Sequence, residues 1–225
     1  FHPILRVGQR VSEYQDLVRQ RFPAYHQQQV QSVEMLPAGI QVKAEAQHVF
    51  SDPKRQTALF LTNTALTLES REHNDRATFR ESMVGALEAF LELHRTFQGT
   101  RFGVRYINII RPEEISHFLG REVGLEGLVG GSYRHLPGTV TLDRDTRFSG
   151  EVVSGVREEG YLTLRYAWRQ KEYHLDFDRY FEGVFDPGEV EVMLEAFTQD
   201  IFEAYLDVAG PDLVEWMEKV QEAVL

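Results

Sequence analysis

The amino-acid sequence predicts an α+β fold in which antiparallel sheets are covered by long amphipathic helices. β-rich runs gather in blocks instead of alternating singly with helices, which argues against a parallel doubly wound sheet. Two such blocks, 30–97 and 102–208, each end in a helix with an apolar stripe. We expect a single α+β domain over residues 1–225, and the repeated order suggests two similar halves at about 1–99 and 100–225.

The first half is expected to contain a helix, an antiparallel meander and a second helix. Ser12 and Gln15 make a capping-box pair for a helix over 11–22. Short β-rich runs separated by Gly, Pro and Asn predict a meander between residues 30 and 70. Thr78 is spaced to cap the second helix, whose apolar residues recur every three or four positions.

The second half opens with the strand "RFGVRYINII" over 101–110, and a short helix is expected around 113–119. The six glycines between 120 and 138 predict a loop with little regular structure. Four β-rich runs follow between 138 and 183. A long helix is expected to start at the Asp-Pro pair at 186–187, and a terminal helix comes after a Gly-Pro break.

Composition restricts the classes of function. The chain has no cysteine, which excludes disulfides, thiolate nucleophiles, cysteine-ligated zinc and iron–sulfur clusters. No apolar run reaches the roughly 18 to 20 residues of a membrane helix, and there is no signal-peptide core, so we expect a cytoplasmic protein without a membrane partner. A net charge of −11 makes a nucleic acid an improbable direct ligand.

The strand at 101–110 carries polar residues among apolar ones. Its period of two places Tyr106 and Asn108 on the apolar face with Phe102, and Arg105 on the opposite face. Asn108 could orient a ligand in a cavity, or it could be a core amide bonded to a neighbouring loop or helix end. We favour the core interpretation, because lone polar residues in a core are commoner than sites.

Four arginines suggest a possible surface. Arg105 and Arg111 share one strand face, and Arg165 and Arg169 share a face of a later run. If those strands are neighbours, four guanidinium groups could bind an anion. The alternative, which we favour, is cross-strand pairing with Asp and Glu in an acidic protein.

A strand with His174, Asp176 and Asp178 on one face has the most metal-like spacing in the chain. Alternating polar residues also mark the wet side of any half-buried strand, so these three are only a weak metal candidate and no metal is predicted. Glu114 and His117 supply a single Glu-x-x-His, whereas a di-iron bundle needs two.

The sequence lacks the motifs of common catalytic sites. There is no Walker A loop, no Rossmann glycine fingerprint, no H-E-x-x-H and no G-x-S-x-G, so no catalytic residue and no cofactor is predicted. Carboxylate pairs that could support hydrolysis exist only through closeness in sequence, at Asp143 with Asp145 and at Glu158 with Glu159.

Three motifs resemble a sporadically distributed prokaryotic family of uncharacterised α+β proteins: "RYIN" at 105–108, "LDFD" at 175–178, and the stretch from Ile201 to Met217. The resemblance implies a stand-alone α+β protein, with the patchy distribution typical of genes on mobile or defence loci. It carries over Arg105, Tyr106, Asn108, Asp176, Asp178, Trp216 and Met217 as motif positions. Phe197 stands where the resemblance leads us to expect a histidine, which argues against a catalytic histidine in that helix.

These observations favour a non-enzymatic binding or regulatory protein, acting in a mobile-element or defence-type gene system through a protein partner or self-association. The binding residues that we predict are Arg105, Tyr106, Asn108, Arg165 and Trp168. One alternative is a small-ligand pocket between sheet and helices, lined by Tyr106, Asn108 and Trp168. The other is a metal- or carboxylate-dependent hydrolase that uses His174, Asp176 and Asp178.

Overall fold

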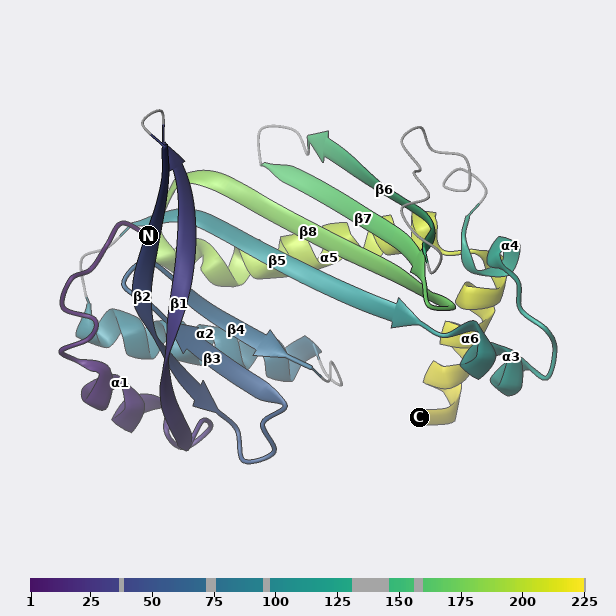
Figure 1. Ribbon diagram of the computed structural model, residues 1–225. Helices are drawn as coiled ribbons and strands as arrows, with labels where there is room; N and C mark the ends of the chain where they lie inside the picture. The colour runs from purple at the N-terminus through teal and green to yellow at the C-terminus, as the bar shows by residue number, and fades with distance from the viewer. Residues whose placement is uncertain (37–38, 72–75, 95–97, 131–145, 156–159, 225) are drawn as a thin grey trace. The chain divides into compact units, whose positions relative to one another are not determined.

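The computed structural model describes residues 1–36, 39–71, 76–94, 98–130, 146–155 and 160–224. It confirms the predicted α+β class, with two antiparallel sheets and helices packed on them (Figure 1). The chain forms two compact units. The first contains residues 1–100 and 183–191, and the second contains residues 101–182 and 192–225.

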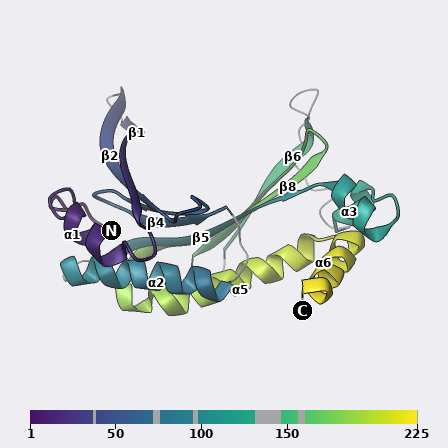
Figure 2. The same ribbon diagram turned by 90° about the horizontal axis from the view of Figure 1, so that it is seen from below.

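The first unit contains the predicted meander between two helices. Its sheet has the order β1-β2-β3-β4, in which consecutive strands pair antiparallel. β3 pairs only with residues 48–51 of β2, so most of the β1–β2 hairpin extends beyond the rest of the sheet (Figure 2). The elements are α1 (Val11–Val18), β1 (Ala24–Leu36), β2 (Gly39–Ser51), β3 (Thr57–Leu61), β4 (Leu66–Ser70) and α2 (Arg76–Leu93).

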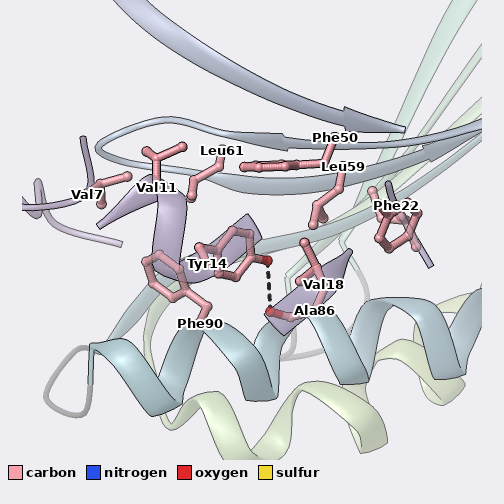
Figure 3. Close-up of a cluster of buried hydrophobic side chains, with 11 residues drawn as sticks. Val7, Val11, Tyr14, Val18, Phe22, Phe50, Leu59, Leu61, Ala86 and Phe90 are labelled. Atoms are coloured by element: carbon pink, nitrogen blue, oxygen red, sulfur yellow. Dashed lines mark hydrogen bonds between the residues drawn. The ribbon is translucent and has the colours of Figure 1, made fainter. Parts of the chain in front are cut away.

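The core of the first unit lies between this sheet and the two helices (Figure 3). Tyr14 of α1 lies at its centre, with ring centroids 5.5 Å from Phe50 and 6.0 Å from Phe90 in edge-on geometry. Its hydroxyl donates a hydrogen bond of 2.9 Å to the carbonyl of Ala86, and burial raises the pKa of Tyr14. The hydrogen bond satisfies the only polar atom of this side chain, so the ring can be buried completely.

Two predicted helix caps are wrong. The carbonyl of Arg10 already accepts a hydrogen bond from the Tyr14 amide, so α1 begins at Val11 and Ser12 lies inside the helix. The helix also ends at Val18, four residues earlier than expected. Thr78 likewise lies inside α2 instead of capping it. In α1 the helical hydrogen bonds start before the residue that the local sequence selects as the cap.

The second unit is built on a sheet with the order β5-β8-β7-β6. Three of the four predicted β-rich runs form strands here, and the run at 138–145 lies outside the described residues. The sheet strands are β5 (Gly99–Ile110), β6 (Thr146–Gly155), β7 (Tyr161–Arg169) and β8 (Glu172–Phe185). The helices are α3 (Pro112–Leu119), α4 (Leu125–Leu128), α5 (Val190–Val208) and α6 (Pro211–Val224), with a 3₁₀ turn at Pro187–Glu189 before α5.

The predicted helix boundaries in this half are largely correct. Gly120 ends α3 with φ 69°, a left-handed conformation that glycine adopts without strain. The Asp186 carboxylate accepts a hydrogen bond from the Gly188 amide, which caps the turn that leads into α5. The glycine-rich stretch contains α4, which the prediction of a loop missed. A Cβ on Gly127 would lie 1.9 Å from Asp212, so glycine is what lets α4 approach α6.

One face of the second sheet, called the inner face below, packs against α5. Phe102 of β5 lies 5.2 Å from Phe197, and Phe177 of β8 lies 5.9 Å from Tyr205, measured between ring centroids. The apolar stripe predicted for this helix is confirmed, because its residues at three- and four-residue spacing are the buried ones. The buried strand residues are Phe102, Val104, Ile110, Leu164, Tyr166, Trp168, Tyr173, Leu175 and Phe177.

Within the part of the chain that the structure describes, none of the helices combines the length and the apolar character that crossing a bilayer requires.

Candidate functional site

The five predicted binding residues all lie in the second unit, but on opposite faces of its sheet. Tyr106, Asn108 and Trp168 belong to the inner face, where Trp168 is buried and the other two are half-buried. Arg105 and Arg165 are exposed on the other face, called the outer face below. The period-of-two assignment in β5 is therefore correct, and the five residues do not form one site.

The outer face is organised around Asp176 of β8. The Nε and Nη2 atoms of Arg105 donate hydrogen bonds of 2.7 and 2.6 Å to the two oxygens of this carboxylate. On the other side, Arg165 of β7 is directly opposite Asp176 in the strand register, with its Nη1 3.7 Å away. One carboxylate thus lies between guanidinium groups from the two neighbouring strands.

The same arrangement repeats along the sheet. Arg111 donates to Glu172 at 2.7 Å. At the other end, Arg101 lies 3.9 Å from Asp178 and 3.7 Å from Glu182. β8 therefore carries a row of carboxylates with arginines from β5 and β7 beside it. Cross-strand pairing, the interpretation favoured from the sequence, is what the structure contains for Arg105, Arg111 and Arg165, which each lie beside a carboxylate of β8.

The metal candidate is part of this row. His174, Asp176 and Asp178 do share a face, but Asp176 and Asp178 are paired with arginines and His174 lies 3.5 Å from Glu172. Across the described residues, no group of three or more His, Cys, Asp or Glu side chains is placed to hold a metal ion. Guanidinium groups stand where a cation would have to bind, since they satisfy the same carboxylate oxygens.

Other acidic candidates give no site in the described part of the chain. Glu114 accepts a 3.3 Å contact from Arg111 on the outside of α3. Asp143, Asp145, Glu158 and Glu159 lie outside the described residues.

The ion pairs of the outer face raise the pKa of two of its arginines. The hydrogen bonds to Asp176 raise the pKa of Arg105, and those to Glu172 and Glu114 raise the pKa of Arg111. Both guanidinium groups therefore remain cations at any physiological pH. Their arrangement suits recognition by charge and hydrogen bonding.

Two isoleucines complete the outer face. Ile107 and Ile109 follow Arg105 on the same side of β5, with exposed fractions of 60% and 48%. Further along the face, the guanidinium of Arg101 lies 5.0 Å from the ring centre of Tyr180. The alternation in the sequence places both isoleucines on the face opposite the core. They were not among the predicted binding residues, although apolar residues on that face indicate exposure. Exposed apolar side chains framed by arginines are typical of the core of a protein–protein interface.

A buried arginine on the inner face was also missed. Arg179 of β8 is fully buried, its Nε donates a 2.7 Å hydrogen bond to Asp200 of α5, and its guanidinium lies 3.9 Å from the ring centre of Phe197. The alternation in β8 places Arg179 on the side of Leu175 and Phe177, so the sequence contained this signal. The carboxylate partner on a different element could not be read from it.

Comparison of the chain with protein-family models, curated proteins and solved structures finds no significant match in any of the three. The resemblance to the prokaryotic family therefore stays a prediction.

Proposed function

We propose that this protein is a non-enzymatic binding protein that engages a protein partner through the outer face of its second sheet. The observation that carries the proposal is the exposure of Ile107 and Ile109 between Arg105 and Arg111. Antiparallel sheets with one face in water usually present polar residues on that face. Exposing two neighbouring isoleucines to water is unfavourable in free energy, and a partner that buries them would remove this penalty.

The state of the charged groups supports binding over hydrolysis. Asp176 accepts two hydrogen bonds from Arg105, and Asp178 lies beside Arg101, so neither carboxylate is placed to activate water. A general base must reach the proton that it removes, and the bidentate hydrogen bonds from Arg105 stabilise the charged form of Asp176 and weaken it as a base.

The chemistry of the face indicates the kind of partner. The isoleucines require apolar side chains opposite them, and the arginines around them, about half exposed, suit carboxylate or carbonyl acceptors at the rim. A net charge of −11 disfavours a nucleic acid. The partner that fits is therefore a protein surface with an apolar centre and oxygen acceptors around it. That it belongs to a mobile or defence-type gene set rests on the family resemblance alone.

The test compares two lysine variants of the full chain. Ile107→Lys/Ile109→Lys places charges in the centre of the proposed interface. Val192→Lys/Leu206→Lys makes the same kind of change at exposed apolar positions of α5 and serves as the matched control. Each protein is purified gently from its native host and analysed by intact native mass spectrometry, and the affinity of any partner found is then measured with purified components.

We expect a complex of fixed stoichiometry with the wild type and the control, and at least a tenfold weaker Kd, about 1.4 kcal/mol, with the outer-face variant. A complex that survives the isoleucine substitutions unchanged would place the interface elsewhere. A chain that carries only a small molecule or a metal ion would replace the binding-protein proposal with one of the two alternatives.

A further inference from the structure

The open edge of the first sheet is formed by a long and regular strand. β1 has 13 residues, and among the described residues it pairs on one side only, with β2, in an unbroken register from Ala24 opposite Ser51 to Leu36 opposite Gly39. About half of the residues in such a strand point their N–H and C=O groups away from the partner strand. The other side of β1 is therefore a row of backbone donors and acceptors that another strand can pair with.

The first part of β1, whose side chains the structure describes, is exposed on both faces. The five consecutive residues from Tyr25 to Gln29 are all exposed. Successive residues of a strand point to opposite faces, so this run means that both faces of β1 are open here. The strand thus has room on its edge and around it.

β1 also lacks the features that usually protect an edge. Proteins block open edges with lysine, proline, bulges or very short strands. β1 contains no Lys, Arg or Pro, no register shift, and a single charged residue, Glu34. The other edges in the described sheets are protected: β4 has five residues, β6 has a register shift between Thr146 and Phe148, and β5 carries Arg101 and Arg105.

We propose that two copies of this chain associate by antiparallel pairing of their β1 strands, which joins the two first sheets into one. A twofold axis at Val30 is the register that pairs all 13 residues, since Val30 is the central residue of β1. In this register the strand sequence places polar residues opposite polar ones and apolar residues opposite apolar ones in every pair except Gln27 with Val33.

A second copy is the occupant that this strand favours, because its sequence of polar and apolar residues matches itself in reverse at all positions but one pair. This inference concerns the first unit and does not depend on the proposed role of the outer face in the second unit. A substitution in β1 leaves Ile107 and Ile109 intact, so failure of the one proposal is distinguishable from failure of the other.

The first test measures mass in solution by light scattering across roughly a hundredfold range of protein concentration. Gln29→Lys/Gln31→Lys places four lysines around the axis of the dimer, and both glutamines are exposed, so the single chain should fold normally. Gln9→Lys/Gln20→Lys adds the same charge at exposed positions of the first unit outside β1.

We expect a dimer for the wild type and for the control, and a Kd at least about tenfold higher for the β1 variant. A wild type that stays monomeric over the whole range overturns the proposal. So does a dimer that the β1 lysines leave as stable as the control.

The second test uses the absence of cysteine to probe the register directly. Val30→Cys places one thiol opposite its counterpart, at the Cα separation of roughly 4.5 to 5.5 Å of antiparallel pairs, which a disulfide can span. Gln28→Cys is the control, because its counterpart would be four residues along the strand, about 14 Å away. Mild oxidation should cross-link Val30→Cys much faster than Gln28→Cys, and equal rates would refute pairing centred at Val30.

Discussion

Each face of the second sheet carries an arginine–aspartate ion pair, and the two pairs have different surroundings. On the outer face Arg105 binds Asp176, and on the inner face Arg179 binds Asp200, in both cases with 2.7 Å from Nε to a carboxylate oxygen. The Arg105 side chain is 53% exposed, whereas that of Arg179 is 0% exposed. A distance alone therefore does not say what an ion pair does. Burial decides whether it holds the fold together or remains available to a partner.

On the inner face, protein groups take the place of the water that would hydrate the Arg179 guanidinium in solution. Arg179 has lost its hydration, and Asp200, the carbonyl of Tyr180 at 3.2 Å and the ring of Phe197 stand in its place. Asp200 keeps part of its exposure, so it lies where the core meets solvent. In the outer pair Asp176 is 16% exposed, but the Arg105 side chain remains 53% exposed to water. An ion pair with an exposed guanidinium is expected to contribute about 1 kcal/mol or less to stability. The comparison therefore predicts stability effects on the inner face and binding effects on the outer one.

The largest effect should follow removal of the inner carboxylate. Asp200→Ala removes the carboxylate that accepts the Nε hydrogen bond of the buried Arg179, so the free energy of unfolding should fall by about 3 to 5 kcal/mol in urea denaturation. Asp207→Asn, at an exposed carboxylate of the same helix, is the control and should stay within about 0.5 kcal/mol of wild type. A loss below about 1 kcal/mol for Asp200→Ala would mean that the buried guanidinium is solvated in some other way.

The next effect comes from two isoleucines on opposite faces of β5. Ile110 is 6% exposed, so Ile110→Ala should cost about 2 to 4 kcal/mol of unfolding free energy through lost burial and a cavity. Ile107→Ala removes the same atoms at a position that is 60% exposed, and should change stability by less than about 0.5 kcal/mol. Thermal and urea unfolding of both variants measures the difference. Similar losses at the two positions would contradict the assignment of the faces.

A smaller, pH-dependent effect is expected at the ring beneath Arg179. Phe197→His should lower the unfolding free energy by about 1 to 2 kcal/mol at pH 8, through weaker packing and a weaker cation–π contact. Burial and the Arg179 charge should depress the pKa of the new imidazole in the folded state, with Asp200 already bonded to Arg179.

The unfolded chain would then bind a proton more readily than the folded one. The variant should lose roughly a further 1 kcal/mol as the pH falls below about 6.5, the unfolded value for histidine. Urea titrations of the variant and the wild type at several pH values test this. Greater stability of the variant at low pH, relative to wild type, would refute the like-charge environment.

The features that the sequence predicted correctly are set by residue types that recur every two residues in a strand or every three to four residues in a helix. The alternation in 101–110 assigned both faces of β5 correctly, because a period of two in a half-buried strand is set by the backbone. The stripe in α5 identified the side of the helix that packs on the sheet. The Asp186 cap was also predictable, since that hydrogen bond spans two residues.

What could not be predicted depended on contacts between distant residues. Arg105 and Asp176 are 71 positions apart, so the spacing of His174, Asp176 and Asp178 resembled a metal site until the neighbouring strand supplied its arginines. Ser12 failed as a cap because the helical hydrogen bonds of α1 already start from the Arg10 carbonyl. Local sequence patterns identify helices, strands and the faces that they bury. The ion-pair partner of a residue on a neighbouring strand can be identified only from the folded structure.

The most direct test of the central claim is a pair of double-mutant cycles in one urea-denaturation series. Arg105→Ala, Asp176→Ala and their double variant give the coupling energy of the outer pair, and Arg179→Ala, Asp200→Ala and their double variant give that of the inner pair. We predict at least about 2 kcal/mol of coupling inside and less than about 1 kcal/mol outside. Equal couplings would contradict the account, because burial would then not distinguish the two pairs.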